Sequence, residues 1–457
     1  MLKRIFIVSV ILIVTAFPQS IKTKLDKITS DKYFDTCLVS IQVEDLNTNK
    51  TIYKKNPKYL LRPASNMKVI TSAAGLLYLT PDYEFKTDLY YDGYVSNDTL
   101  YGSVYVSGGC DPDFVTKDLY TFVDAIKSLK VSVITGNLYG DVSFKDSLYW
   151  GKGWMWDDDP SSDAPYLSSL NINDNCVEVF YDAKKNKTKI HPQTNYVEVK
   201  RIEDEIDLTI DRNWLNRKNE IIIKGKSEKK NYYSKVNVLN PAKYFLTVFS
   251  EVLDTNSIKL SGEIEIKNVP ANANRLTTFS RKYVEVIDNL NKESDNLSAE
   301  MTLYAIAEKF FGKPATAKNG VSMLMKMIDK VGLDSNDYRL VDGSGVSHYN
   351  VFSAELLVTI LKYFYKNEPQ LFKILYESFP IAGFDGTLES RMNKTSAENN
   401  VHAKTGTLTG VSSLTGYTTA KNNHTIAFSI IMQNYIGSSA KAKEFQDEIC
   451  RLLSEYK

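Results

Sequence analysis

Hydrophobic patterning is of one kind at both ends of the chain and of another kind in its middle, and this difference constrains the fold most. Residues 38–54 alternate as a β-hairpin, and apolar residues follow at helical spacing from Met67 to Leu77. The last third has helical patterns, then strands, then a final helix: 283–290, 297–311, 321–331 and 353–365, then 401–408, 412–419 and 425–433, then 440–456. Together the two ends predict one antiparallel sheet with helices on its faces.

The middle of the chain, from about residue 86 to residue 274, has short β-like pieces between polar turns rich in Asn and Lys. These pieces cover 88–94, 100–106, 197–199, 206–210, 220–223 and 263–266, with one helical segment near 241–253. A chain of 457 residues is also too long for one ordinary domain. We therefore predict an α+β fold in which one or two β-rich domains are inserted into a domain built from both ends.

The N-terminus predicts export. Lys3 and Arg4 precede an apolar run from Ile5 to Phe17, and a polar segment follows. This is the pattern of a secretory signal peptide, which we place at 1–20. The run is shorter than the roughly 20 residues that span a bilayer, so we expect no membrane span after signal cleavage, although an uncleaved anchor is the alternative.

Charge and cysteine content exclude several classes of function. The formal net charge is +1, which does not favour nucleic acid or an anionic membrane surface as a partner. The four cysteines form no Cys-x-x-Cys pair and do not cluster with the four histidines, so we expect no metal site. They allow three disulfide pairings, between which the sequence does not choose.

The first of three short motifs places a hydroxyl beside an amine. Ser65 and Lys68 stand at the start of the first helical pattern, and at this spacing both lie on one face of a helix. A serine is a poor nucleophile until a neighbouring base accepts its proton. A lysine serves as that base only when burial or nearby cations lower its pKa from about 10.4. By itself, a Ser-x-x-Lys sequence is often accidental.

The other two motifs add proton-relay and binding groups. In Ser294-Asp295-Asn296, between two helical patterns, the Ser294 hydroxyl can relay a proton and the Asn296 amide can fix a substrate carbonyl. The same residue types are also the usual helix caps, which is the alternative. Lys404-Thr405-Gly406-Thr407 lies in a strand pattern, where a glycine indicates that a ligand backbone comes close. Its alternative is a solvent-facing strand.

In this order and these settings, the three motifs resemble the signature of serine β-lactamases and penicillin-binding proteins. The long insertion between the first two motifs narrows the resemblance to the low-molecular-mass class C penicillin-binding proteins, a D-Ala-D-Ala carboxypeptidase/endopeptidase family (peptidase family S13). Further segments similar to that family are 61–65, 108–112, 153–158, 240–242, 342–347 and 382–388. One departure is Cys110, where a glycine is expected; we expect it to affect packing more than chemistry.

The resemblance implies a penicillin-binding, β-lactamase-like transpeptidase domain made of 21–94 and 273–457, an inserted domain made of 95–166 and 236–272, and another made of 167–235. It also implies a periplasmic hydrolase that trims D-Ala-D-Ala ends or cross-links of peptidoglycan stem peptides. Such an enzyme needs no cofactor and is inhibited by β-lactams. Carboxypeptidase and endopeptidase action use the same acyl-enzyme and stay undecided.

The resemblance further implies roles for the motif residues. Lys68 accepts the proton of Ser65, which attacks the carbonyl of the penultimate D-alanine, and the backbone N–H groups of Ser65 and Thr407 hold the oxyanion. Ser294, with Lys404 nearby, passes a proton to the leaving amine, and Asn296 holds the acyl-side peptide. The carboxylate of the terminal D-alanine lies against Thr405 and Thr407, on either side of Gly406.

A separate hypothesis concerns Asp157 and Asp158, which stand beside Trp154 and Trp156. These carboxylates are candidates for binding the free amine of diaminopimelate in the stem peptide. The alternative is an acidic surface turn with two tryptophans in the core.

Two other functions fit part of the pattern. A β-lactamase-like hydrolase would need an efficient deacylation base between the second and third motifs, and we find none there. A catalytically silent peptidoglycan-binding protein would not need all three motifs intact. A Ser-His-Asp hydrolase is disfavoured because the sequence has no Gly-x-Ser-x-Gly elbow.

Overall fold

The computed structural model of the chain describes residues 20–202, 207–225 and 231–457. The predicted signal peptide therefore lies outside the described residues, except for Ser20. This residue accepts a hydrogen bond from the Thr23 backbone N–H and caps α1 (Ile21–Thr29). Among the helices of the described segments, none has the length and apolar character needed to cross a membrane.

The two ends of the chain meet in one antiparallel sheet, as predicted. Its strand order is β18 (His402–Leu408), β19 (Val411–Thr419), β20 (Thr425–Gln433), β1 (Leu38–Asp45) and β2 (Lys50–Lys55). The join is the pairing of β1 with β20, which runs from Leu38 opposite Gln433 to Asp45 opposite Ile426. Strand β18 is an edge strand, so one side of it is free to meet other parts of the molecule.

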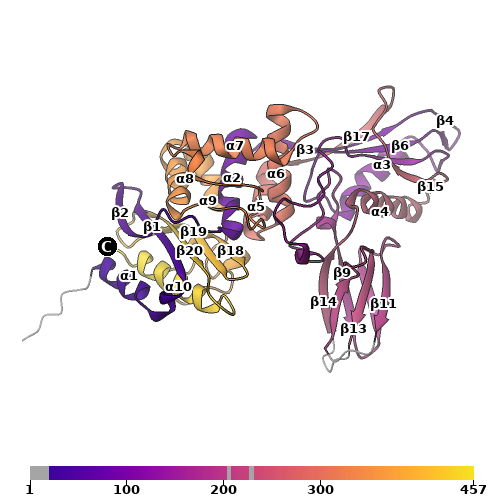
Figure 1. Cartoon of the computed structure of the whole chain (residues 1–457). Coiled ribbons are helices and arrows are strands. Elements are labelled where there is room, and N and C mark those ends of the chain that lie inside the picture. The colour runs from indigo at the N-terminus through magenta and orange to yellow at the C-terminus, as the bar shows by residue number, and fades with distance from the viewer. Residues whose placement is uncertain (1–19, 203–206, 226–230) are drawn as a thin grey trace, which may run out of the picture.

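Helices cover both faces of this sheet because its strands are apolar on both sides. In β20, Phe428 and Ile430 belong to the core shared with α1 and α10 (Ala440–Ser454), whereas Ala427 and Ile431 belong to the core shared with α8 (Ala354–Asn367). Figure 1 shows α1 and α10 on one side and the larger helical group on the other. The antiparallel pairing of all five strands agrees with the predicted α+β class.

The helical group is centred on α2 (Met67–Tyr78), in which every residue from Met67 to Leu76 is buried. Around it pack α5 (Tyr283–Lys292), α6 (Asn296–Phe311), α7 (Ala317–Lys330) and α9 (Pro369–Ser378). All of these except α9 were predicted. Helix α9 does have apolar residues at helical spacing, since Leu371, Phe372 and Ile374 pack partly buried against the core beside the buried Leu375, so this helix was missed although its sequence carries a signal.

A second lobe holds a mixed five-stranded sheet of order β16 (Ile264–Ile266), β8 (Leu138–Asp141), β6 (Val104–Gly108), β3 (Glu84–Tyr91) and β17 (Asn274–Lys282). A smaller sheet joins β15 (Lys259–Leu260), β7 (Val133–Ile134), β5 (Thr99–Tyr101) and β4 (Tyr94–Ser96). The prediction of a single helix in the middle of the chain is wrong. Besides α4 (Pro241–Thr255), this lobe contains α3 (Tyr120–Ser128), whose charged and polar positions obscured its short apolar stripe.

A third lobe extends away from the other two (Figure 1). It consists of two three-stranded sheets, one of β10 (Lys187–His191), β9 (Cys176–Asp182) and β14 (Asn231–Asn237), the other of β11 (Glu198–Ile202), β13 (Glu220–Lys224) and β12 (Thr209–Arg212). The domain boundaries proposed from the sequence stay a prediction. Strands β3 and β17, which those boundaries assign to the transpeptidase domain, pair within the sheet of the second lobe.

The four cysteines, Cys37, Cys110, Cys176 and Cys450, are all described, buried and free, so none of the possible disulfides is formed. Cys110 departs from the expected glycine, and its φ of 64° lies in the left-handed region that favours glycine. The departure therefore concerns backbone conformation as well as packing.

Candidate active site

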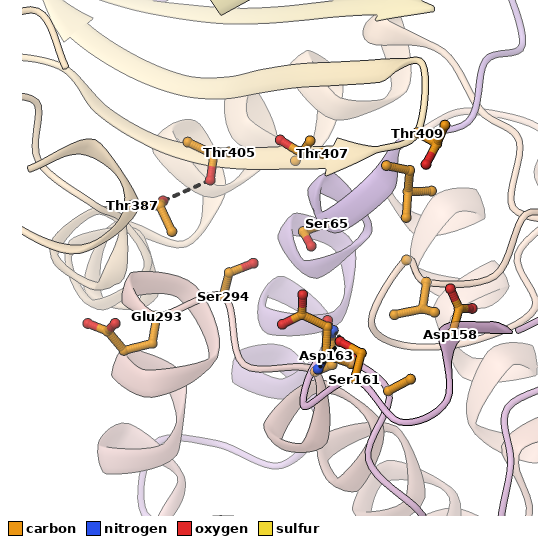
Figure 2. A pocket seen from close by; sticks show the side chains of 16 residues that line it. Ser65, Asp158, Ser161, Asp163, Glu293, Ser294, Thr387, Thr405, Thr407 and Thr409 are labelled. Carbon is orange, nitrogen blue, oxygen red and sulfur yellow. Dashed lines mark hydrogen bonds between the residues drawn. The ribbon is translucent and has the colours of Figure 1, made fainter. Parts of the chain in front are cut away.

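A cavity of about 440 Å³ lies where the sheet edge, the helical group and a loop of the inserted part meet. It is lined by Ser65, by Ser294 and Asn296, by residues 405–409 of β18 and the turn after it, and by residues between 158 and 164. Figure 2 shows Ser65, Ser294, Asp163 and Asp158 around this space, each from a different part of these segments. Residues of all three sequence motifs thus come together in one cavity.

Ser65 lies in a single 3-10 turn, η2 (Ala64–Asn66), that leads directly into α2. Two glycines allow other segments to approach this turn. A Cβ atom on Gly406 would lie 2.9 Å from the Pro63 carbonyl oxygen, and one on Gly345 would lie 2.0 Å from the Ala64 carbonyl oxygen. The glycine in β18 was interpreted as leaving room for a ligand backbone. The structure places the protein's own turn there instead.

Lys68 is fully buried and its Nζ lies 3.2 Å from the Ser65 Oγ. The amine also donates to the Ser344 carbonyl oxygen at 2.7 Å and to the Asn296 Oδ1. Burial lowers the pKa of Lys68 to about 8, against the opposing effect of nearby carboxylates, of which Asp295 is the strongest. Lys68 is therefore placed and tuned to accept a proton from Ser65.

Lys404 occupies the middle of β18 and is also fully buried. Its Nζ donates to the Ser294 Oγ at 2.8 Å and to the Thr405 carbonyl oxygen at 2.9 Å. Burial lowers the pKa of Lys404 well below its usual value, and the positive charge of Lys68 lowers it further. The site therefore contains two lysines whose charged forms are both disfavoured.

The second motif, Ser294-Asp295-Asn296, is both a helix cap and a source of site residues. Asp295 is a helix cap, since it accepts a hydrogen bond from the Ser298 backbone N–H at 2.5 Å at the start of α6. Its neighbours have different contacts: Ser294 meets Lys404, whereas Asn296 contacts Lys68 through Oδ1 and donates through Nδ2 to the Asp163 carbonyl oxygen at 2.5 Å. The cap fixes the loop so that both side chains face the lysines.

Hydroxyl groups line the part of the cavity next to β18. The Thr405 and Thr387 hydroxyls are 2.8 Å apart, Thr407 is exposed, and Thr409 follows in the turn after the strand (Figure 2). Hydroxyls next to the amine of Lys404 are suitable donors for a carboxylate. Thr387 and Thr409 were not predicted as site residues: Thr387 lies in the segment 382–388 that is similar to the family but was given no role, and Thr409 stands in no motif.

Of the two carboxylates in the diaminopimelate hypothesis, Asp158 lies at the cavity and Asp157 does not. Asp158 lines the cavity, accepts a hydrogen bond from the Met155 backbone N–H at 2.7 Å, and has a pKa raised by burial. Asp157 is exposed and does not line the cavity. Of the two tryptophans, Trp154 is in the core and donates to Asp342, but Trp156 is 68% exposed.

Sequence motifs did not reveal the support behind Lys68. The Ser344 carbonyl that accepts from this lysine belongs to a Gly-Ser-Gly turn, and Glu300 Oε1 accepts the Gly343 and Ser344 N–H groups at 2.9 and 2.8 Å. Asp342 accepts the N–H groups of Gly345 and Ser347 from the same turn. The signal in the sequence was the similarity of segment 342–347 to the family, which assigned no role to Ser344.

Comparisons with a family model and with a curated relative both give D-Ala-D-Ala carboxypeptidases. The model of the D-Ala-D-Ala carboxypeptidase 3 (S13) family matches residues 21–456. D-alanyl-D-alanine carboxypeptidase DacB of Haemophilus influenzae is 28% identical over 424 residues, which cover 89% of this chain and 87% of the relative.

Solved structures agree with the family match. The crystal structure of penicillin binding protein 4 (dacB) from Haemophilus influenzae is similar with a TM-score of 0.85 and 26% identity, covering 94% of this chain and 99% of that one. A structure of the same protein complexed with a novel β-lactam has a TM-score of 0.77 and 25% identity, with coverage of 95% and 99%.

Proposed function

The chain belongs to the D-Ala-D-Ala carboxypeptidase 3 (S13) family and is a serine-type D-Ala-D-Ala carboxypeptidase, and we propose that it acts through an acyl-enzyme on Ser65. The observation that carries this proposal is the 3.2 Å distance between the Ser65 Oγ and the Nζ of Lys68, a buried amine with a lowered pKa. A neutral amine at hydrogen-bond distance is what a serine nucleophile requires.

Acylation begins when Lys68 takes the proton of Ser65 and the Oγ attacks the carbonyl of the penultimate D-alanine. The oxyanion lies between the backbone N–H groups of Ser65 and Thr407, which belong to segments held together at Gly406. The Ser344 carbonyl and Asn296 hold the Lys68 amine toward Ser65 throughout. With its two N–H bonds directed at these acceptors, the neutral amine turns its single lone pair toward the Ser65 hydroxyl.

The leaving amine receives a proton through Ser294, whose hydroxyl already accepts a hydrogen bond from Lys404. The carboxylate of the terminal D-alanine binds Thr405 and Thr407, with the Lys404 amine behind them. Asn296 holds the acyl-side peptide once its Nδ2 exchanges the Asp163 carbonyl for a substrate carbonyl. Water then hydrolyses the acyl-enzyme, which frees the peptide and restores Ser65. Carboxypeptidase and endopeptidase cleavage both follow from this intermediate.

β-Lactams fit the same site. A similar protein has been crystallised with a β-lactam, and the strained ring carries an acyl group and a carboxylate that match the two ends of the proposed site. We propose that β-lactams acylate Ser65 and inhibit the enzyme. We also propose that the enzyme is exported to the periplasm, in keeping with the apolar segment at its N-terminus, and acts on peptidoglycan stem peptides there.

For the diaminopimelate side chain we now propose Asp158 alone as the partner of the free amine. An ammonium group next to this half-buried carboxylate would offset the burial that raises its pKa. Asp158→Asn is expected to reduce turnover of diaminopimelate-containing peptides about tenfold relative to turnover of analogues that lack this free amine. Asp157→Asn is the matched control. Equal effects of the two substitutions would contradict this assignment.

The activity is tested by mass analysis of products from a pentapeptide and from a cross-linked muropeptide dimer. Loss of one alanine from the first is carboxypeptidase action, and monomers from the second are endopeptidase action. Ser65→Ala should abolish both products and also labelling by a fluorescent penicillin. Labelling that persists in Ser65→Ala would place the acyl group on another residue.

A further inference from the structure

A groove lined by aromatic side chains lies next to the active-site cavity but outside it. Its lining includes Tyr149, Trp156, Asp159, Trp214, Leu215 and Arg217. We call this the aromatic groove. It measures about 290 Å³, and none of these side chains has a part in the proposed reaction.

The aromatic groove exposes large apolar side chains to an unusual degree. Trp156 is 68% exposed, Leu215 is 71% exposed and Tyr149 is 49% exposed. Single exposed apolar residues are ordinary on a protein surface, but a gathered set indicates a binding site. The set comes from two distant parts of the sequence, the loop at 149–159 and the turn after β12, so the fold assembles it.

The rings are arranged as platforms. The Trp156 and Trp214 ring centroids are 5.0 Å apart with an interplanar angle of 38°, and Tyr149 stacks on Tyr166 at 5.8 Å and 14°. The Arg217 guanidinium lies 5.8 Å from the centre of the Tyr149 ring. Flat aromatic faces next to a cationic hydrogen-bond donor can contact an apolar face and polar edges of the same ligand.

A buried ion pair holds the two sides of the groove together. The Asp159 carboxylate pairs with Arg212 of β12, which is fully buried, and also accepts a hydrogen bond from the Tyr166 hydroxyl at 2.9 Å. Arg212 donates in turn to the Asn237 carbonyl oxygen at 3.1 Å. The ring platforms therefore stand on a fixed base, and their surface exists before any ligand binds.

The aromatic groove and the active-site cavity are adjacent along one loop. Asp158 lines the cavity that contains Ser65, and the next residue, Asp159, lines the groove. A ligand that extends from the cavity along this loop would therefore reach the groove. The occupant of the groove is therefore expected to be part of the same substrate molecule.

We propose that the aromatic groove binds the glycan strand to which the stem peptide is attached, as a chain of β-linked N-acetylated amino sugars. This inference rests on the proposed function, because that function supplies a substrate whose peptide is tethered to sugar. A β-linked pyranose has C–H groups on its faces and hydroxyl and amide groups on its edges, which matches aromatic faces bordered by Arg217. Tethering also means that weak sugar binding suffices, since the second contact is intramolecular.

The direct test is titration of the full chain with N-acetylchitotetraose, followed by tryptophan fluorescence and calorimetry. The wild-type protein should give a saturable signal, and Trp214→Ala should weaken binding about tenfold. Tyr94→Ala is the matched control, because Tyr94 is 64% exposed and stacks on Tyr101 in a separate hairpin. If Trp214→Ala changes the thermal unfolding curve, Arg217→Ala at the exposed rim replaces it.

Kinetics provide the second readout. Trp214→Ala should leave kcat/KM for a free pentapeptide unchanged and lower it several-fold, through KM, for a pentapeptide carried on a soluble glycan chain. The inference is overturned if wild-type protein shows no saturable sugar binding, or if Trp214→Ala and Tyr94→Ala have equal effects on the glycan-linked substrate. It is also overturned if Trp214→Ala instead dissociates an oligomer in sedimentation, which would make the groove a contact between copies.

The sugar titration needs no turnover and can be repeated with Ser65→Ala. A failure of the proposed function would abolish pentapeptide turnover and leave sugar binding in place, whereas a failure of this inference would leave pentapeptide turnover intact. The two outcomes are therefore distinguishable.

Discussion

On the proposed mechanism, acylation requires a neutral Lys68, so the pH dependence of acylation tests the reasoning most directly. Burial lowers the pKa of Lys68 from 10.5 to about 8, which corresponds to about 3 kcal/mol against the charged form. At pH 7 about one amine in ten is then neutral, against fewer than about one in a thousand for an ordinary lysine.

The rate of acylation should therefore rise about tenfold per pH unit between pH 6 and pH 7.5 and level off above pH 8. The sign follows from the role of the group: the deprotonated amine is the active form, so activity is lost as the pH falls. The measurement is the second-order rate constant for labelling by a fluorescent penicillin at fixed ionic strength, with thermal unfolding followed at each pH. A rate that is flat below pH 7, or still rising at pH 10, would falsify the assignment of Lys68 as the base.

A charge-changing variant makes the same test without altering the base. The negative charge of Asp163, an exposed residue at the cavity, raises the pKa of Lys68. Asp163→Asn should therefore shift the rise of the acylation rate with pH to lower pH, because it removes a charge that stabilises the ammonium form of Lys68. Asp124→Asn, at an exposed position of α3, is the control and should leave the limb in place. A shift to higher pH in Asp163→Asn would contradict the electrostatic argument.

Three further predictions concern the surroundings of the site. Ser294→Ala, which removes the hydrogen-bond partner of Lys404, should lower pentapeptide turnover about a hundredfold in steady-state kinetics. It should change the unfolding free energy, measured by denaturant titration, by less than about 1 kcal/mol. Gly406→Ala should strongly reduce penicillin labelling, since the new Cβ would lie 2.3 Å from the Ser413 Oγ and 2.9 Å from the Pro63 carbonyl oxygen. Cys110→Gly relieves left-handed backbone strain of about 1 kcal/mol but loses a stabilisation of similar size from the buried side chain. The midpoint of denaturant unfolding should therefore hardly move, and a large shift in either direction would contradict this balance.

Periodicity predicted most elements of this chain in which apolar spacing is regular. The first hairpin, α2 and the last three strands all have regular apolar spacing, and the pairing of β1 with β20 confirms the predicted sheet. Helix α3 was missed because it is short and interrupted by charged residues, and its contacts with the rest of the fold decide its conformation. Helix α9 was missed although its apolar residues have helical spacing.

The site was predictable only to the extent that its residues form motifs. Ser65, Lys68, Ser294, Asn296 and Lys404 could be selected because their spacing carries a chemical reason, and the fold brings them into contact. Ser344 lies in the selected segment 342–347 but could not be given its role, and Glu300 was not selected, because one acts through a backbone carbonyl and the other accepts backbone N–H groups. Such contacts constrain the path of the chain rather than the side chain, and a single sequence does not display them.

In the mechanism that we propose, the two buried lysines give a physical reason why one site can both remove and return a proton. Lys68 and Lys404 are fully buried, and the charge of Lys68 lowers the pKa of Lys404. When Lys68 takes the proton of Ser65, a protonated Lys404 therefore becomes more acidic at the moment when the leaving amine needs a proton. The Ser294 hydroxyl, 2.8 Å from the Lys404 Nζ, provides the path. Burial of both amines thus couples bond formation at Ser65 to bond cleavage on the other side of the same carbonyl.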